Sequence, residues 1–260
     1  MVGDSPLAGQ VAWVTGGGSG IGLAGAVELG RLGCRVVVSG RDEAKLAAAV
    51  DAAVARGVPA TAIRAAALDV GDAEAVARVA VSIVADHGGV DILVNSAGIN
   101  FPKRHWIDST PASFAAVMTI NLNGAANCTY AVLEGMRARG RGTVINVSSF
   151  VGWHLTHLTG PAYTASKAGL MAMTQAFNIE EGVHGLRATA LCPGEVATPI
   201  LKRRPVEPSE AEKARMLQED DLGRTIGFIA SMPPHVCINE LVIAPVWNRL
   251  YLGLEEMPRR

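Results

Sequence analysis

The 260-residue chain is 49% hydrophobic and carries a formal net charge of −1. This length allows one large core, so we expect a single domain over residues 1–260. Acidic and basic residues are interspersed, so the chain has no long-range field that would attract nucleic acid or a membrane surface.

Short β-branched segments alternate with longer helical patterns along the chain. The predicted strands are 11–15, 35–39, 61–68, 90–95, 142–148, 186–191 and 240–244. The predicted helices are 20–32, 42–56, 72–87, 111–138, 163–182 and 220–231. This alternation predicts an α/β fold, a doubly wound and mostly parallel sheet with helices on both faces. Ligands bind such sheets beyond the carboxyl ends of the strands, so the residues that follow each strand are the candidate site.

A glycine-rich turn follows the first predicted strand and opens a helix. Missing side chains there let a diphosphate approach backbone N–H groups and the positive end of the helix. Its place in the first βαβ unit predicts a dinucleotide site rather than a plain turn. The expected contacts are Gly16, Gly18, Ser19, Gly20, Ile21 and Gly22.

The end of the second predicted strand bears on the choice between NAD and NADP. An acidic residue there would bind the ribose hydroxyls and repel a 2′-phosphate, but this chain has Gly40 followed by Arg41. A guanidinium favours the 2′-phosphate, so we expect NADP(H), with Ser39 as an extra donor and NAD(H) as the alternative. On the alternative interpretation Arg41 is a solvated residue, and Asp42 caps the next helix or turns toward the ribose.

The third and fourth strand ends offer further cofactor contacts. Asp69 is placed to meet the adenine amine and Val70 the adenine ring. Asn95, Ala97 and Gly98 belong to a segment of small residues where the cofactor would pass.

Tyr163 and Lys167 are four residues apart on a predicted helix and therefore share a face. A phenol ionises near pH ~10, and it exchanges protons at neutral pH only where a fixed cation favours the phenolate. Lys167 supplies that charge, although helical pairs of this spacing are common and usually have no catalytic role.

These motifs together resemble the short-chain dehydrogenase/reductase family, in order and spacing across nearly the whole chain. The segments that carry the resemblance are Thr15–Gly22, Asn95–Gly98, Asn121, Ser149, Tyr163–Lys167 and Pro193-Gly194. The resemblance implies an enzyme with a seven-stranded Rossmann-type sheet, which transfers a hydride between nicotinamide C4 and an alcohol or carbonyl carbon without a metal.

The resemblance also implies the roles of the site residues. Tyr163 donates a proton to the substrate oxygen, Ser149 hydrogen-bonds that oxygen, and Lys167 lowers the tyrosine pKa and holds the nicotinamide ribose. Asn121 binds a water that links Lys167 to solvent. Ser149 precedes Tyr163 by fourteen positions, one more than is commonest in the family, which leaves Ser148 as a competitor. The implied contacts to the nicotinamide end are Pro193, Gly194, Val196 and Thr198.

Two loops that follow strands are expected to shape the substrate pocket, a roof at 150–160 and a mobile flap at 199–217. Basic residues in Lys103–Trp106 and Lys202–Arg204 can pair with a carboxylate or sulfonate, which makes an acidic substrate a hypothesis. Solvated loops have the same composition. The candidate substrate contacts are Arg104, His154, His157 and Arg203.

The tail Pro233–Ile243 resembles a branch that contains bacterial NADP-dependent 3-hydroxy acid (serine-type) dehydrogenases. This likeness favours a small hydroxy acid or its semialdehyde as substrate. The alternatives are reduction of a 3-oxoacyl chain on an acidic carrier protein docked at Lys202–Arg204, and a dinucleotide-sensing or structural protein that is not an enzyme. The small-residue-rich helices 111–138 and 163–182 and the family resemblance predict a homo-oligomer, a dimer or a homotetramer.

Residues 1–6 lack the basic start and apolar run of a secretory signal, so we expect a cytoplasmic protein. Two long segments without charged residues, 109–133 and 142–166, are interrupted by polar residues, glycine and proline, which excludes membrane spans. The cysteines show no metal or redox spacing and are expected to be reduced: Cys34, Cys128, Cys192 and Cys237.

Overall fold

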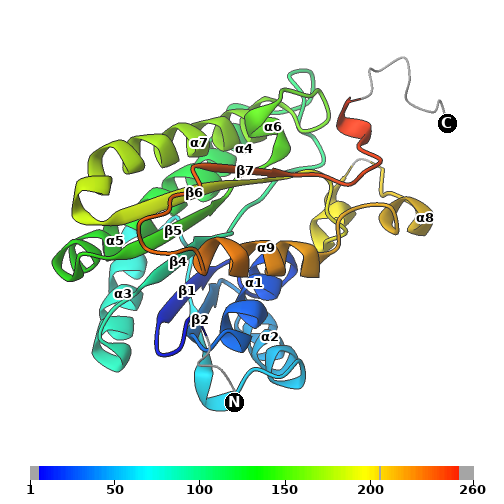
Figure 1. Cartoon of the computed structure of the whole chain (residues 1–260). Coiled ribbons are helices and arrows are strands. Elements are labelled where there is room, and N and C mark those ends of the chain that lie inside the picture. The colour runs from blue at the N-terminus through cyan, green and yellow to red at the C-terminus, as the bar shows by residue number, and fades with distance from the viewer. Residues whose placement is uncertain (1–5, 205, 252–260) are drawn as a thin grey trace.

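Seven parallel strands form one sheet in the order β3-β2-β1-β4-β5-β6-β7 (Figure 1). The computed structural model describes residues 6–204 and 206–251, without the side chains of Arg203 and Arg249. The strands are β1 Val11–Thr15, β2 Arg35–Gly40, β3 Ile63–Ala67, β4 Ile92–Asn95, β5 Gly142–Val147, β6 Leu186–Pro193 and β7 Glu240–Ile243. The predicted doubly wound sheet is therefore confirmed, and its strand order reverses between β1 and β4, where such sheets bind ligands.

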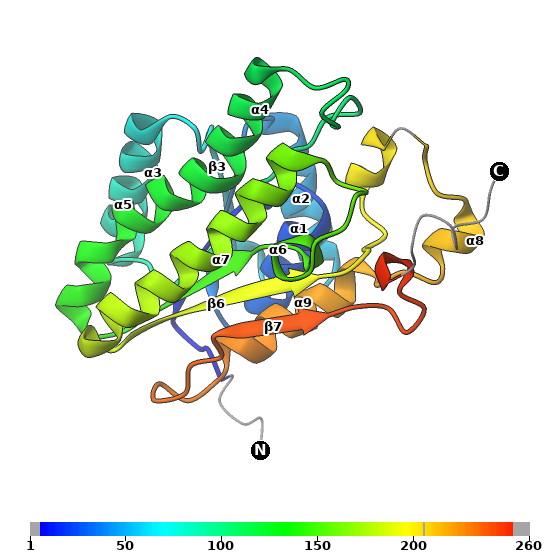
Figure 2. The same ribbon diagram turned by 90° about the horizontal axis from the view of Figure 1, so that it is seen from above.

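Helices cover both faces of this sheet, as Figures 1 and 2 show from two directions. One face carries α1 Gly20–Arg31, α2 Glu43–Ala55 and α9 Glu219–Ala230. The other carries α3 Ala73–His87, α4 Pro111–Met118, α5 Gly124–Arg139 and α7 Pro161–Glu181. Shorter elements are η1 Ala60–Ala62, α6 Phe150–Trp153, η3 Gly182–His184, η4 Pro199–Arg203, α8 Glu210–Lys213 and η5 Arg249–Tyr251.

Strand β1 is fully buried and contributes side chains to the hydrophobic cores on both faces of the sheet. Ala12 and Val14 belong to the core beneath α1 and α9, whereas Val11 and Trp13 belong to the core beneath α3 and α5. Side chains alternate along a strand, so apolar residues at every position are what a sheet covered on both faces requires.

The predicted helix 111–138 is two helices joined by a wider turn. Thr110 and Ser113 form a capping box that starts α4, and Pro111 occupies its first turn. The π-helical turn η2 Thr119–Asn123 then separates α4 from α5. Such turns insert an extra residue into a helix and often occur at functional sites. This one carries Asn121, whose side chain is buried.

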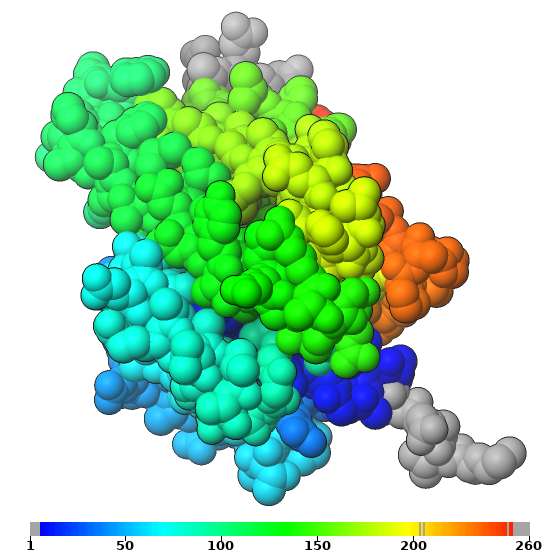
Figure 3. Space-filling view, turned by 90° about the vertical axis from the view of Figure 1, so that its left-hand side faces the viewer, coloured from blue at the N-terminus to red at the C-terminus, as the bar shows by residue number. Residues whose placement is uncertain are grey.

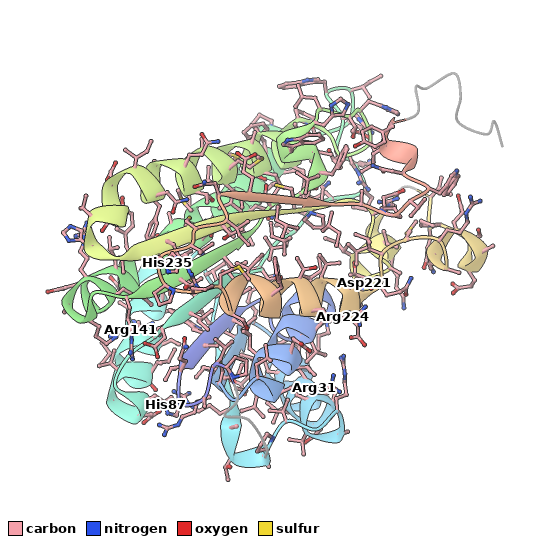
Figure 4. The ribbon with its side chains drawn as sticks, in the orientation of Figure 1. Arg31, His87, Arg141, Asp221, Arg224 and His235 are labelled. Atoms are coloured by element: carbon pink, nitrogen blue, oxygen red, sulfur yellow. The ribbon has the colours of Figure 1, made fainter. Side chains whose placement is uncertain are left out.

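Arg187 of β6 anchors the connection between α9 and β7. Its guanidinium donates to the Thr143 hydroxyl and to four backbone carbonyls of the connection, those of Ala230, Met232, Pro233 and Val236. His235 lies on this connection, at the end of the sheet away from α8 (Figure 4). An arginine that is mostly buried is stable there because hydrogen bonds satisfy its donors.

The carboxyl ends of β6 and β7 point toward α8 and η5, on the right of Figure 1. Figure 3 shows the opposite side of the molecule, where α3 and α5, in cyan and green, contribute to the surface. Within the described residues, every helix is too short or too polar to cross a bilayer. All four cysteines are free thiols, of which Cys237 is exposed.

Candidate active site

The glycine-rich turn packs directly against the end of β4. Gly16 has φ +67°, and a Cβ there would lie 2.7 Å from the backbone nitrogen of Ala97. A Cβ at Gly22 would lie 2.4 Å from the carbonyl oxygen of Gly16. Both distances are too short for any side chain, so the close approach of the turn to β4 and to α1 requires glycine at these two positions.

The start of α1 is open to an anion. Ser19 precedes the helix in extended conformation and forms no side-chain cap, and the first turn contains no acidic residue. The first N–H groups of a helix have no partner within the helix, and they favour negative charge. Gly20 has φ +59°, and a Cβ there would lie 3.6 Å from the Thr198 side chain, across the space between α1 and the flap. A dinucleotide diphosphate fits this arrangement.

Two of the residues expected at the adenosine end are paired with one another. An Arg41 guanidinium nitrogen lies 4.0 Å from a carboxylate oxygen of Asp69, and both side chains are largely exposed. Asp42 caps α2 by accepting a hydrogen bond from the Lys45 amide at 3.0 Å. Of the two roles considered for Asp42, the structure shows the cap, and that hydrogen bond lowers the pKa of its carboxyl.

Ser39 does not face the cofactor end, contrary to the sequence prediction. Its side chain is fully buried, and its hydroxyl accepts a hydrogen bond from the Trp13 indole at 3.0 Å. A buried indole N–H needs an acceptor, and Ser39 supplies it from the neighbouring strand. The hydroxyl of Ser39 is therefore excluded as a donor to a 2′-phosphate.

Asn95 also points into the protein. Its amide donates to the Asn146 side chain at 2.9 Å and lies 3.3 Å from the Thr129 hydroxyl. Its neighbours Ser96 and Gly98 line the cavity instead. The Asn95 side chain is therefore directed away from the cofactor, and the segment approaches the cavity through its small residues. Val70 is buried and packs against Gly124.

Three of the four predicted catalytic residues converge on one cavity of about 570 Å³, between the glycine turn and the flap, whereas Asn121 is buried behind its wall. Ser149, Tyr163 and Lys167 line it, together with Gly16, Ser19, Gly20 and Ile21 of the glycine turn. Lys167 is 4% exposed, its ammonium donates to the Val147 carbonyl at 2.7 Å, and it lies 5.7 Å from the centre of the Tyr163 ring. The helical spacing thus brings the phenol and the ammonium to the same wall.

Burial and charge act in opposite directions on Tyr163. Burial, the largest effect, raises the pKa of the phenol, while a hydrogen bond with Ser149 and the positive charges of Arg204 and Arg104 lower it. The balance is a raised pKa, and the expected lowering by Lys167 is not among these effects. Burial also lowers the pKa of Lys167 to about 8, because the charged form loses its hydration. Both groups are therefore perturbed within one cavity, as is common for acid–base residues.

The two candidate serines occupy different environments. The Ser148 hydroxyl is 3% exposed and donates to the Lys167 carbonyl at 2.9 Å. Ser149 precedes α6 in extended conformation and forms the hydrogen bond with Tyr163, although both serines line the cavity. The longer loop between Ser149 and Tyr163 contains α6, which the sequence analysis did not predict.

The Asn121 side chain binds the backbone of the loop that follows β4. Its side chain accepts from the Ile99 amide at 2.8 Å and donates to the Ile99 carbonyl at 3.0 Å. It also donates to the Ser166 hydroxyl at 3.2 Å, next to Lys167 on α7. A Cβ on Gly98 would lie 3.6 Å from the Asn121 oxygen and 3.8 Å from the Lys167 nitrogen. The π-helical turn therefore places Asn121 beside Lys167.

The flap is closed at its base by backbone hydrogen bonds. The Leu217 amide donates to the Glu195 carbonyl at 3.0 Å, and the Ala197 amide donates to the Leu217 carbonyl at 2.8 Å. Val196 and Thr198 line the cavity at this point, with Pro193 and Gly194 at the end of β6. The nicotinamide-end residues implied by the resemblance therefore meet Ser149 and Tyr163 in the same cavity.

The substrate candidates divide into two groups. Arg104 and His157 line the cavity. His154 does not, because its ring packs against Phe150 and Tyr251, with centroids 5.7 and 6.0 Å away. The structure therefore does not bring His154 to the cavity, and the side chain of Arg203 lies outside the described residues.

The predicted contacts left out several cavity residues, among them Glu195, Arg204 and Leu250. Glu195 is 5% exposed, and its carboxylate forms an ion pair with the Arg204 guanidinium at 2.5 Å. Leu250 reaches the cavity from the C-terminal segment. A signal for Glu195 existed in the sequence, since it is an acidic residue directly after Pro193-Gly194 at the end of an apolar strand. Leu250 carries no comparable signal.

Comparisons with known proteins agree with this geometry. The family model described as short chain dehydrogenase matches residues 10–208. L-rhamnose 1-dehydrogenase (NAD(P)(+)) of Azotobacter vinelandii is 35% identical over 84% of this chain and 88% of its own. D-beta-hydroxybutyrate dehydrogenase of Cupriavidus necator is 32% identical over 86% and 92%. Glycine betaine reductase ATRR of Emericella nidulans is 33% identical, but the match spans only 19% of that protein.

The fold comparison leads to the same family. A metagenomic short-chain oxidoreductase solved in complex with NADP has a TM-score of 0.78 and 32% identity, and the match covers 93% of this chain and 99% of that one. The matched residues include the glycine turn, Ser149, Tyr163 and Lys167. This chain belongs to the short-chain dehydrogenase family of NAD(P)-dependent oxidoreductases.

Proposed function

We propose that this protein is an NADP(H)-dependent enzyme that interconverts a secondary alcohol and the corresponding carbonyl compound, and that its substrate is a small hydroxy acid or its semialdehyde. The observation that carries the proposal is the meeting of Ser149, Tyr163 and Lys167 in a cavity that also contains the glycine turn. The bound cofactor would supply the hydride in reduction and accept it in oxidation.

The side chains of Ser149, Tyr163 and Lys167 would carry out the proton transfer. In reduction, the carbonyl carbon gains the hydride and the oxygen gains the proton of the Tyr163 hydroxyl, while Ser149 donates a hydrogen bond to the same oxygen. In oxidation the proton moves from the alcohol to Tyr163. By the family resemblance, Lys167 would favour the ionised phenol through its charge, and Asn121, which lies beside it, would bind a water that links it to solvent.

The cofactor would lie along the carboxyl ends of the strands. Its diphosphate would meet the glycine turn and the start of α1, and its nicotinamide would meet the residues from Pro193 to Thr198. Arg41 supports NADP over NAD, because a guanidinium pairs well with phosphate and is largely exposed at the end of β2. The NADP complex of the metagenomic relative is consistent with this preference.

Support for a hydroxy acid comes from the substrate end. Arg104 and Arg204 line the cavity, and the name of the Cupriavidus relative specifies a hydroxy acid. The Azotobacter relative acts on a sugar, so neutral polyols are the second class to compare.

The test is NADPH-dependent reduction of a panel of oxo acids, semialdehydes, ketones and sugar lactones, with 3-oxoacyl chains offered both free and carrier-linked. Turnover of free small substrates is expected. A requirement for the carrier would favour the reductase of carrier-bound chains. Cofactor binding without any turnover would favour a dinucleotide-sensing protein. The cytoplasmic location and the homo-oligomer stay predictions, and size measurement in solution tests the second.

A further inference from the structure

Leu250 brings an apolar side chain to the cavity from the far end of the chain. Among the described residues beyond β7, it is the one that lines the cavity. It belongs to η5 and is only 9% exposed. A leucine side chain forms no hydrogen bond, so it favours the approach of an apolar part of a ligand and disfavours a hydroxyl.

An aromatic contact places η5 beside α6. The ring centroid of Tyr251 lies 5.2 Å from that of Phe150, in an edge-to-face arrangement, and 6.0 Å from that of His154. Phe150 is fully buried and directly follows Ser149. Figure 1 shows η5, in red, near α6. Because Leu250 precedes Tyr251, it reaches the cavity from the side of Ser149, where the substrate oxygen would be held.

The other end of the same segment is attached to the flap. The Arg215 guanidinium lies over the Trp247 ring, 4.0 Å from its centroid, which is a favourable cation–π distance. Arg215 is two positions before Leu217, whose backbone closes the base of the flap. Residues 247–251, which we call the C-terminal strap, therefore connect the flap to α6.

Hydrogen bonds of Asn248 fix the turn between these two contacts. The Leu250 amide donates to the Asn248 side-chain oxygen at 3.1 Å, and the Tyr251 amide donates to the Asn248 carbonyl at 3.2 Å. The backbone that carries Leu250 is thus held from both ends and within the turn. A side chain on such a backbone has a defined position in the cavity wall.

The roof and the flap contribute apolar side chains to the same cavity. Val151 of α6 is 1% exposed, and Leu201 of η4 is 3% exposed. Both line the cavity, as Leu250 does. Each of the three segments around the substrate side therefore supplies a buried aliphatic side chain. Such a lining recognises a hydrocarbon group through the apolar surface that it removes from water.

We infer that Leu250 determines substrate specificity by packing against an alkyl group on the carbonyl carbon, and that the C-terminal strap positions it for this role. This inference rests on the proposed function, because it assigns a substituent to the substrate of the same cavity. A hydroxy acid with an alkyl group on its carbinol carbon satisfies it. A polyhydroxylated chain does not, since its hydroxyls would lose water at Leu250 without gaining a partner.

The experiment compares pentan-2-one with 4-hydroxybutan-2-one, in which a hydroxyl replaces the terminal methyl group. The wild type should prefer pentan-2-one about 10-fold in kcat/KM. Leu250→Asn, a change to a polar side chain of similar size, should reduce this preference below about threefold, whereas Leu250→Met should keep it. Val246→Asn is the matched control, because Val246 is fully exposed just before the strap.

A binding measurement keeps the test independent of turnover. The probe is 2-methylpentan-2-ol, a tertiary alcohol whose carbinol carbon has no hydrogen to give up as hydride. Its affinity for the protein with NADP+, measured by calorimetry, should fall about 10-fold in Leu250→Asn. Leu250→Met and Val246→Asn should bind it as the wild type does.

The contribution of the strap has its own variants. Tyr251→Ala should weaken the preference for pentan-2-one, although the Tyr251 side chain does not line the cavity. Tyr251→Phe should retain the preference, since the ring against Phe150 is kept. A lower unfolding midpoint of Tyr251→Ala with an unchanged preference would refute the positioning role of the strap.

The outcomes separate this inference from the proposed function. If no compound of the wider carbonyl panel is reduced, the proposed function fails, and the affinities for 2-methylpentan-2-ol alone decide the role of Leu250. If pentan-2-one is reduced but Leu250→Asn has the preference of the wild type, Leu250 is refuted as a determinant while the enzyme stands. Preference of the wild type for 4-hydroxybutan-2-one would also refute it.

Discussion

The Lys167 ammonium donates a hydrogen bond to the Val147 carbonyl at 2.7 Å, and the lysine side chain is almost entirely buried in the wall of the cavity. Burial lowers the pKa of Lys167 from its ordinary value near 10.5 to about 8. The unfolded chain therefore binds more protons than the folded chain between pH 8 and 10.5. The charge costs about 3 kcal/mol of stability below pH 8, and this cost disappears as the pH rises toward 10.5.

Lys167→Met should accordingly abolish turnover and yet raise the thermal unfolding midpoint of the cofactor-free protein at pH 7. The gain should shrink at pH 10, where the wild type has recovered its own stability. Thermal unfolding at both pH values, followed by circular dichroism, measures the effect. A variant that is less stable than the wild type at pH 7 would contradict this account of Lys167.

Tyr163→Phe should lower kcat by about 10²- to 10⁴-fold, because the substrate oxygen loses its proton donor. The affinity for NADPH, measured by nicotinamide fluorescence, should stay within about threefold, since the ring is kept. Tyr130→Phe is the matched control, because Tyr130 is 75% exposed on α5. Retained turnover in Tyr163→Phe would overturn the proposed mechanism.

Ser149→Ala and Ser148→Ala should distinguish the catalytic hydroxyl from the one that only stabilises the fold. Ser149→Ala should reduce kcat by about 10²-fold or more, because it removes a hydrogen bond to the reacting oxygen. Ser148→Ala should leave kcat near the wild-type value and cost about 1 kcal/mol of unfolding free energy, since it loses the bond to the Lys167 carbonyl. The reverse pattern would show that the longer loop shifts the catalytic serine.

Arg41→Ala should weaken NADPH binding by about 10- to 100-fold and leave NADH binding nearly unchanged, because only NADPH carries the 2′-phosphate. Parallel fluorescence titrations measure both affinities. Arg78→Ala, which removes another exposed arginine on α3, controls for the general loss of charge. Equal weakening of both cofactors would argue against a phosphate contact.

Arg187→Met should destabilise the fold by about 3 kcal/mol, because the carbonyls of the α9–β7 connection lose their shared donor. Urea unfolding measures the change. Arg224→Met is the control, since Arg224 pairs with Asp221 on the exposed side of α9 (Figure 4). Similar stability of the two variants would refute the anchoring role of Arg187.

Much of the framework was predictable because its signals are local. The β-branched run Val11–Thr15 matches β1, and the glycine turn after it leads into α1 as expected. The spacing of Tyr163 and Lys167 was sufficient to place both on one face of α7, since helical geometry is nearly invariant.

The errors arose where a side chain has a choice of partners. Ser39 and Asn95 end strands at the cofactor edge, and only the interior decides that Trp13 and Asn146 bind them. The partnership of Glu195 with Arg204 depends on how the flap folds back, which no local pattern encodes. The hydrogen bond between Asn121 and Ile99 likewise joins residues 22 positions apart, which no local pattern encodes.

The paired backbone bonds of Leu217 with Glu195 and Ala197 join the two ends of the flap at one point. Changes of length or composition within the flap should therefore act mainly on that closed loop, provided that Thr198 and Arg204, which reach the cavity, are kept. The segment can be exchanged as a cassette. Libraries of variants confined to this segment offer a way to alter which alcohols the protein accepts, while the hydride donor and the acid–base residues keep their positions.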